Sequence, residues 1–192
     1  SNVATAKIAL DMKSEDYWRL LHHLGFGAQP GAGLASEATG RLRPFETWRP
    51  IEKATMAYGH GMSVSLLQLA RAYAAIANDG ILPPVTVLKR REAAVGSRVL
   101  SEETAQVMRD MLESVTQDVG TAPQARIMGY RVAGKTGTAH KLVDGRYAPD
   151  KYIGSFVGMA PASAPRLVVA VMIDEPDGTQ YYGGLVAAPV FA

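Results

Sequence analysis

The pair Asp144-Gly145, between two extended segments, constrains the fold more than any other feature of this chain. An Asp-Gly pair favours the tight turn of a β-hairpin, so residues 131–139 and 151–160 are predicted to pair as antiparallel strands. A third run, residues 166–173, follows after a short segment bounded by prolines. It is predicted to continue the sheet through a second hairpin.

The residues before this sheet show helical periodicity instead. Apolar side chains recur at helical spacing over residues 17–24, 66–77 and 104–115. Serine caps helix N-termini, and the serines predicted to begin these helices are Ser14, Ser63 and Ser101. A Gly- and Pro-rich loop over residues 26–50 follows the first helix. Helices first and strands last predict an α/β fold of the α+β type, an antiparallel sheet flanked by helices.

The composition of the 192 residues is that of a globular protein, with 47% hydrophobic and 20% charged residues. The net charge of +2, from 20 basic and 18 acidic residues, is too balanced for a nucleic-acid partner. Cysteine is absent, which excludes disulfides and thiolate zinc sites and fits an oxidising compartment such as the periplasm. We expect no metal and no cofactor. No apolar run approaches the roughly 20 residues that cross a bilayer.

The tetrapeptide Lys135-Thr136-Gly137-Thr138 lies in the first predicted strand. Its ammonium would attract a carboxylate, and its two hydroxyls would donate hydrogen bonds. Gly137, which has no side chain, would let an extended peptide pair against the strand. The tetrapeptide alone leaves a second interpretation open, because surface lysines are common on edge strands, where they discourage aggregation.

The same residues complete another pattern, because residues 129–136 read G-x-x-x-x-G-K-[ST], the phosphate loop of nucleotide-binding enzymes. A phosphate loop must leave a strand and enter a helix, whose N-terminal amides face the phosphates. The Asp144-Gly145 turn follows too soon after Thr136 for a helix of normal length. The sequence therefore favours a peptide-binding strand, with a nucleotide site as a remote alternative that ATP-dependent thermal stabilisation would test.

On these residues the chain resembles the penicillin-binding proteins, serine D,D-transpeptidases whose signatures are S-x-x-K, S-x-N and K-[TS]-G. Residues 134–141 match the third signature, and Ser1-Asn2 resembles the end of the second. The resemblance covers nearly the whole chain and is nearest to the class B enzymes, in particular the penicillin-binding protein 3 group of Gram-negative cell division. The segments most similar to class B enzymes are 49–61, 68–73, 152–163 and 181–191.

The chain departs from the family at the first signature. None of its seven lysines has a serine three residues before it. The resemblance then implies that the nucleophile and its base precede Ser1. Residues 1–192 would be the C-terminal portion of a transpeptidase domain, and both ends look cut from a longer protein. We expect the chain alone neither to acylate nor to be readily soluble, since missing strands would expose a sheet edge.

The resemblance also implies roles for individual residues. An upstream serine would attack a D-Ala-D-Ala stem peptide, a step that β-lactams mimic, and form an acyl-enzyme. Lys135 would hold the terminal carboxylate, with hydroxyls from Thr136 and Thr138. The Thr138 N–H would form half of the oxyanion hole, and Gly137 would keep the strand open to the ligand. Asn2 would position the substrate amide.

Four aromatic or imidazole residues are further candidates for substrate and β-lactam binding. Tyr58 and His60 lie in a Tyr-Gly-His-Gly turn that approaches the cleft in this family. Packing is an equally good interpretation for Tyr58, and the odds for a binding role are somewhat worse for His60. Tyr181 and Tyr182 would form an aromatic wall, and as neighbours in a strand only one is expected to face the cleft. His140 either reaches ligand substituents or has a structural place on the hairpin.

Several alternatives and partners follow from the resemblance alone. A D,D-carboxypeptidase or β-lactamase would use water as the acceptor, and a penicillin-sensing receptor domain would acylate without turnover. The class B type implies septal cell-wall synthesis at the periplasmic face of the inner membrane. Its implied partners are divisome proteins and a membrane glycosyltransferase.

Overall fold

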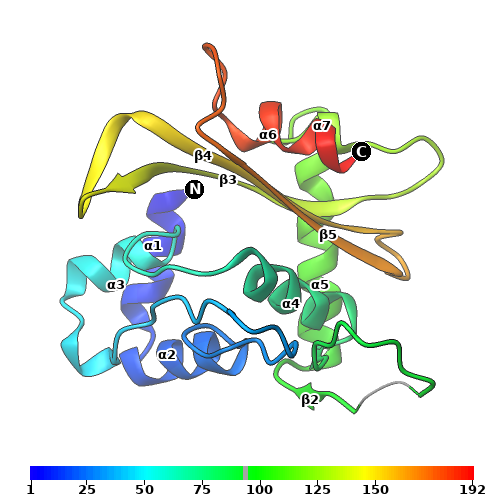
Figure 1. The fold of residues 1–192 in the computed structure, drawn as a ribbon, viewed down its shortest axis with the longest axis horizontal. Helices are drawn as coiled ribbons and strands as arrows, with labels where there is room; N and C mark the ends of the chain where they lie inside the picture. The colour runs from blue at the N-terminus through cyan, green and yellow to red at the C-terminus, as the bar shows by residue number, and fades with distance from the viewer. Residues whose placement is uncertain (93–94) are drawn as a thin grey trace.

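A computed structural model describes residues 1–92 and 95–192 and shows an antiparallel sheet between two groups of helices (Figure 1). The strand order is β3 (Ala133–Val143), β4 (Arg146–Ala160) and β5 (Leu167–Asp174). Both predicted hairpins are confirmed, since β4 pairs antiparallel with each neighbour. Asp144 and Gly145 have positive φ angles of 49° and 78°, the backbone that a tight hairpin turn requires.

The first hairpin is longer than the sequence predicted. β3 and β4 stay paired up to the turn, with Val143 opposite Arg146. The register shifts by a bulge between His140 and Leu142. A bulge lets a strand bend and resume its pairing beyond the bend. The strands therefore stay paired through the polar residues near the turn, where the sequence predicted that they would end.

Seven α-helices are present in the described residues: α1 (Asn2–Asp11), α2 (Ser14–His23), α3 (Pro50–Met56), α4 (Leu66–Ala77), α5 (Glu102–Glu113), α6 (Gly183–Val186) and α7 (Ala188–Phe191). Three short 3-10 turns are η1 (Phe45–Thr47), η2 (Ser114–Thr116) and η3 (Pro123–Ala125), and β1 (Ile81–Leu82) pairs with β2 (Ser97–Arg98). The helical periodicity of the sequence predicted α2, α4 and α5, whereas α1, α3, α6 and α7 were not predicted.

Two of the three predicted helix starts are wrong. Ser101 does cap α5, but Ser14 lies inside the first turn of α2, after Lys13. α4 is capped by Ser65, whose hydroxyl accepts from the Gln68 N–H at 3.1 Å while Gln68 Oε1 accepts from the Ser65 N–H at 2.8 Å. Ser63 is extended instead, because it exchanges two backbone hydrogen bonds with Arg41.

Apolar clusters cover both faces of the sheet. Phe156 and Met159 are both fully buried and lie three residues apart on β4, so they face opposite sides. Phe156 packs among small residues in or next to η3 and α7, including Ala125 and Ala188. Met159 packs with Leu112 of α5 and Tyr73 of α4. The middle of β4 is therefore buried between different helices on its two sides, whereas β3 beyond Gly134 and the whole of β5 are exposed or half-buried.

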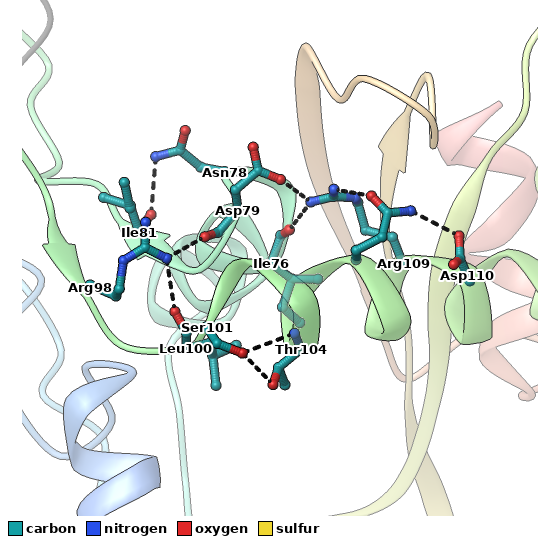
Figure 2. Close-up of polar contacts among 11 residues, drawn as sticks. Ile76, Asn78, Asp79, Ile81, Arg98, Leu100, Ser101, Thr104, Arg109 and Asp110 are labelled. Atoms are coloured by element: carbon teal, nitrogen blue, oxygen red, sulfur yellow. Dashed lines mark hydrogen bonds and ion pairs between the residues drawn. The ribbon is translucent and has the colours of Figure 1, made fainter.

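A buried arginine joins α4 to α5 (Figure 2). Arg109 is only 5% exposed, and its guanidinium donates to the Ile76 carbonyl at 2.8 Å and the Asp79 carboxylate at 2.8 Å. Arg98 approaches the same corner and donates to the Asp79 carbonyl at 2.8 Å. Because burying an unpaired charge is costly, these partners define where α4 ends against α5.

None of the helices in the described residues is both long and apolar enough to cross a membrane. Within residues 1–92 and 95–192, no three His, Cys, Asp or Glu side chains gather in a way that could hold a metal ion.

Candidate active site

Lys135 to Thr138 occupy the middle of β3, the terminal strand of the sheet. Its only strand neighbour among the described residues is β4. Gly137 lies opposite Ser155, and a Cβ at Gly137 would be 2.4 Å from Ser155 Oγ. A side chain at this position would force the Ser155 hydroxyl to move, and the glycine avoids that contact. An extended peptide could pair with the edge of this terminal strand.

The Lys135 ammonium has no carboxylate within ion-pair distance in the part of the chain that the structure describes. Its Nζ donates to the Thr136 carbonyl at 3.1 Å and lies 3.4 Å from Thr136 Oγ1. The residue as a whole is exposed, but partial burial of its ammonium lowers the pKa of Lys135. An anion bound here would supply the missing negative charge.

The two threonine hydroxyls of β3 contact the segments that precede η3 and begin α6. Thr136 Oγ1 lies 3.0 Å from Thr121 Oγ1. Thr138 Oγ1 accepts a hydrogen bond from the Gly183 N–H at 3.0 Å. In this contact the hydroxyl oxygen of Thr138 is the acceptor. The hydroxyl proton is therefore available to donate to a ligand.

Sequence reasoning assigned no role to Thr121, Gly183 or Gly184, although the Gly-Gly pair was visible. A Cβ on Gly183 would lie 2.2 Å from the Ser155 carbonyl, and one on Gly184 would lie 2.0 Å from the Thr121 carbonyl. The pair therefore lets α6 approach the strand closely enough to reach Thr138. The signal in the sequence is the Gly-Gly pair itself, because adjacent glycines allow one backbone segment to lie close against another.

A groove of about 390 Å³ lies between the sheet and the segment that joins α3 to α4. Gly137 and Thr138 line it on the strand side, Ser155 lines its floor, and Tyr58 lines the opposite wall. A larger hollow of about 550 Å³ lies between the end of α4 and the start of β5, away from the Lys-Thr-Gly-Thr stretch. The smaller groove is therefore the one that adjoins the candidate chemistry.

The predicted strand at Tyr181 and Tyr182 is wrong, since these residues precede α6 in irregular backbone. The Tyr181 ring stacks on Tyr152 at a centroid distance of 3.8 Å and contacts Tyr182 at 4.6 Å. The two tyrosines thus contact each other and do not alternate across a strand. His140 continues the stack, 4.5 Å from Tyr152, and its Nδ1 lies 2.9 Å from the Ala148 carbonyl. This contact favours the structural interpretation of His140.

A pair of lysines fixes the end of β5 beside this stack. Lys141 Nζ lies 2.7 Å from Asp174 and 2.8 Å from Glu175, and Lys151 Nζ lies 2.9 Å from Glu175. The Glu175 N–H donates to the Tyr152 carbonyl at 2.9 Å. These contacts hold the segment that leads from β5 to Tyr181.

The Tyr-Gly-His-Gly turn lies across the groove from β3. Tyr58 lines the groove and is 38% exposed. The His60 ring contacts Tyr58 edge-to-face at 5.6 Å and Tyr147 of the hairpin at 5.9 Å. His60 therefore links this turn to the β3–β4 hairpin and is not among the residues that line the groove.

Asn2 is the first residue of α1 and is exposed. Ser1 caps this helix by accepting the Ala4 N–H at 3.4 Å. Among the described residues, no hydrogen bond joins the Asn2 side chain to Lys135 or Thr138. The structure therefore brings Gly137 and Thr138 together with Tyr58 at one groove, and Lys135 and Thr136 precede them directly on the same strand. It leaves Asn2 outside that set of residues.

The phosphate-loop alternative is contradicted by the structure. Thr136 lies inside β3, which runs on to Val143 and turns directly into β4. No helix follows the Lys-Thr pair within this hairpin, so no helical amides are available to face a phosphate.

The comparisons agree with this geometry. The model of the family described as "Penicillin binding protein transpeptidase domain" matches residues 1–192, and the chain belongs to that family. It is 47% identical over 191 residues to the probable peptidoglycan D,D-transpeptidase PenA of Neisseria meningitidis, covering all of this chain and 33% of that protein. It is 42% identical over 192 residues to peptidoglycan D,D-transpeptidase FtsI of Escherichia coli, covering all of this chain and 32% of that one.

Solved structures show the same fold. The transpeptidase domain of penicillin-binding protein 3 from Burkholderia pseudomallei aligns with a TM-score of 0.93 at 52% identity, covering all of this chain and 58% of that one. Penicillin-binding protein 3 from Mycobacterium tuberculosis, complexed with aztreonam, aligns with a TM-score of 0.90 at 36% identity, covering all of this chain and 47% of that one. The predicted family and fold are confirmed, and the chain spans about a third of the curated relatives it matches.

Proposed function

We propose that these residues are the C-terminal portion of the catalytic domain of a peptidoglycan D,D-transpeptidase. The observation that carries the proposal is the ammonium of Lys135, which lies without a carboxylate partner among the described residues on an edge strand beside two hydroxyls. Two relatives that match over the whole chain are named peptidoglycan D,D-transpeptidases, which gives this anion site a substrate class.

The proposed ligand is the C-terminal end of a stem peptide. Its carboxylate would be held by Lys135 and by the hydroxyl protons of Thr136 and Thr138, in charge-assisted hydrogen bonds. Its extended backbone would lie along the edge of β3, where Gly137 leaves the strand uncovered. β-Lactams would occupy the same place. Penicillin-binding protein 3 from Mycobacterium tuberculosis has been solved in complex with aztreonam and with ampicillin, which supports a β-lactam as a ligand.

The proposed reaction proceeds by a serine acyl-enzyme. A serine hydroxyl loses its proton to a nearby base and attacks the carbonyl between the two D-alanines, and the terminal D-Ala leaves as an amine. The amine of a neighbouring stem then attacks the ester and releases the serine. The Thr138 N–H would stabilise the developing oxyanion, a contribution of about 3 kcal/mol for one such donor. The serine and its base would lie in polypeptide that precedes residue 1, and Asn2 would orient the substrate amide.

The proposed setting is septal cell-wall synthesis at the periplasmic face of the inner membrane. The similarity to FtsI of Escherichia coli supports this setting. Divisome proteins and a membrane glycosyltransferase would be the partners there. Tyr58, His60, Tyr181 and Tyr182 would contribute to substrate or β-lactam binding, Tyr58 from the groove wall and His60 through its contact with Tyr58.

The test uses the protein that contains these residues together with the polypeptide before them. A fluorescent penicillin is expected to label it covalently, and a stem pentapeptide is expected to release D-Ala only slowly until an acceptor amine is added. Cross-linked product should appear together with the D-Ala. Release to water alone would indicate a carboxypeptidase, a long-lived penicillin adduct without any peptide turnover would indicate a receptor, and no labelling would overturn the proposal.

A further inference from the structure

Lys53 is a buried cation that the proposed chemistry does not use. It lies in α3 and is only 8% exposed. No carboxylate lies within ion-pair distance of its ammonium in the described part of the chain. Burial of an ammonium is costly unless strong hydrogen-bond acceptors surround it. The hydrogen-bond acceptors of the Lys53 ammonium therefore identify the part of the structure that Lys53 holds in place.

Those acceptors are carbonyls at the C-terminal end of α1. Lys53 Nζ donates to the Leu10 carbonyl at 3.2 Å and makes a close contact with the Met12 carbonyl. The last carbonyls of a helix have no partner within the helix and carry its negative dipole end. α1 has no basic residue in its own last turn. Lys53 supplies this cation from a different helix, 43 residues from Leu10 in the chain.

Of the two helices joined by Lys53, α1 carries Asn2, a residue with a proposed role in the reaction, and α3 leads to the groove. The other end of α1 begins at Asn2, about 15 Å away along the helix. α3 ends in the turn that follows Met56, where the Gly59 N–H donates to the Met56 carbonyl at 3.2 Å. Tyr58 and Gly59 of this turn line the groove. One ammonium therefore links the helix that carries Asn2 to the wall that faces β3.

We propose that Lys53 is a positioning residue of the active site. Its ammonium caps α1 from α3 and so sets Asn2 at a defined distance from the Tyr58 side of the groove. This inference rests on the proposed function, because Asn2 orients a substrate amide only in an acyl-transfer enzyme. Small displacements of such groups reduce reaction rates strongly, whereas they change binding of the rest of the ligand much less.

The experiment compares Lys53→Met, Lys53→Arg and Lys7→Met in the protein that includes the preceding polypeptide. Lys7 is the matched control, because it is an exposed lysine on α1 itself. Each variant is acylated with a fluorescent penicillin well below its melting temperature, and rates are normalised to titrated active sites. The first-order constant at saturation and the half-saturating concentration are determined separately. Hydrogen exchange of the α1 amides is measured in parallel.

Lys53→Met is expected to lower the first-order acylation constant about tenfold, with little change in the half-saturating concentration. The α1 amides should exchange faster in this variant. Lys53→Arg, which keeps the charge, should restore most of the rate, and Lys7→Met should match the wild type.

An unchanged rate per active site in Lys53→Met would overturn the inference, even with a lower melting temperature, since Lys53 would then only stabilise the fold. If Lys53→Met does not fold, Lys53→Gln carries the same comparison, because its amide is an uncharged and shorter donor. A failure of the proposed function would look different from a failure of this inference, because the wild-type protein itself would then not be acylated.

Discussion

The apolar clusters gather around the sheet, α6 and α7, whereas in the helical half buried polar side chains of α3 and α4 act beside a few buried apolar residues such as Met56. Both apolar clusters consist of residues from Tyr73 onward. In the helical half, Lys53 caps α1, and Gln68, which is 1% exposed, donates to carbonyls of the Gly- and Pro-rich loop. Glu37 accepts three backbone N–H groups of that same loop, at 2.7 to 3.0 Å.

The difference concerns the two walls of the groove. The sheet wall, which Gly137 and Thr138 line, belongs to a close-packed sheet, where steric fit determines atomic positions. The Tyr58 wall follows a helix that is fixed by a few directional hydrogen bonds, each sensitive to charge. Substitutions that add volume should therefore damage the sheet wall most. Removal of a single polar group or a change of pH should act on the helical wall.

The largest effect is expected for Lys135→Ala on the sheet wall. In the protein with its preceding polypeptide, the second-order acylation constant should fall about 100-fold, because charge-assisted hydrogen bonds contribute about 1.5–3 kcal/mol. Acylation by a fluorescent penicillin measures this loss. Lys89→Ala, which alters an exposed loop lysine, should leave the constant unchanged. A loss below threefold at Lys135 would show that the carboxylate is held elsewhere.

Gly183→Ala should damage the sheet half through steric overlap. Its Cβ would lie 2.2 Å from the Ser155 carbonyl and 2.4 Å from the Gly137 carbonyl. We expect the free energy of unfolding, measured in urea, to fall by about 3 kcal/mol. Gly178→Ala is the control: its Cβ meets nothing within 4 Å, and only its positive φ of 90° opposes the substitution, at a cost of about 1 kcal/mol. Equal losses would contradict the steric argument.

Gln68→Met tests the polar packing of the helical half. Its side-chain amide donates to the carbonyls of Gly25, Ala28 and Thr39, and all three contacts would be lost. The expected loss of unfolding free energy is about 2 kcal/mol, because the hydrogen bonds of a side chain that is only 1% exposed would be removed. Gln124→Met, at an exposed position of η3, should change it by less than about 0.5 kcal/mol. A loss at Gln68 no greater than at Gln124 would mean that the loop is held by other contacts.

The smallest effect is a pH dependence at the start of α3. The Arg49 backbone N–H and the Arg43 guanidinium lower the pKa of Glu52 from 4.5 to about 2. A lowered pKa stabilises the folded state above the unfolded value, so this contribution is full above about pH 4.5 and is lost as the pH falls toward 2. Melting temperatures across this range should fall more steeply for the wild type than for Glu52→Gln.

The control for this pH dependence is Glu46→Gln, which alters an exposed carboxylate of η1. The melting temperature of this variant should fall with decreasing pH as steeply as that of the wild type. Parallel slopes for the wild type and Glu52→Gln would indicate that the charge of Glu52 does not contribute to holding α3.

Elements with strong local signals were predictable, and elements made by packing were not. Asp144-Gly145 indicated the hairpin because only a few residue pairs adopt two successive positive φ angles readily. α1 was missed because its apolar residues do not gather on one face, and only Ala9 is buried. α6 was missed because its two glycines have low helix propensity.

The sequence by itself determined the antiparallel sheet, the Lys-Thr-Gly-Thr stretch on its strand and the family to which the chain belongs. These rest on residues that are neighbours in the chain, where turn geometry and strand chemistry act locally. Only the tertiary structure decided that Gly183 contacts Thr138 and that Lys53 contacts Leu10, pairs that are 45 and 43 residues apart. Such contacts depend on how whole elements pack, and no local pattern specifies which distant carbonyl or hydroxyl a given N–H will meet.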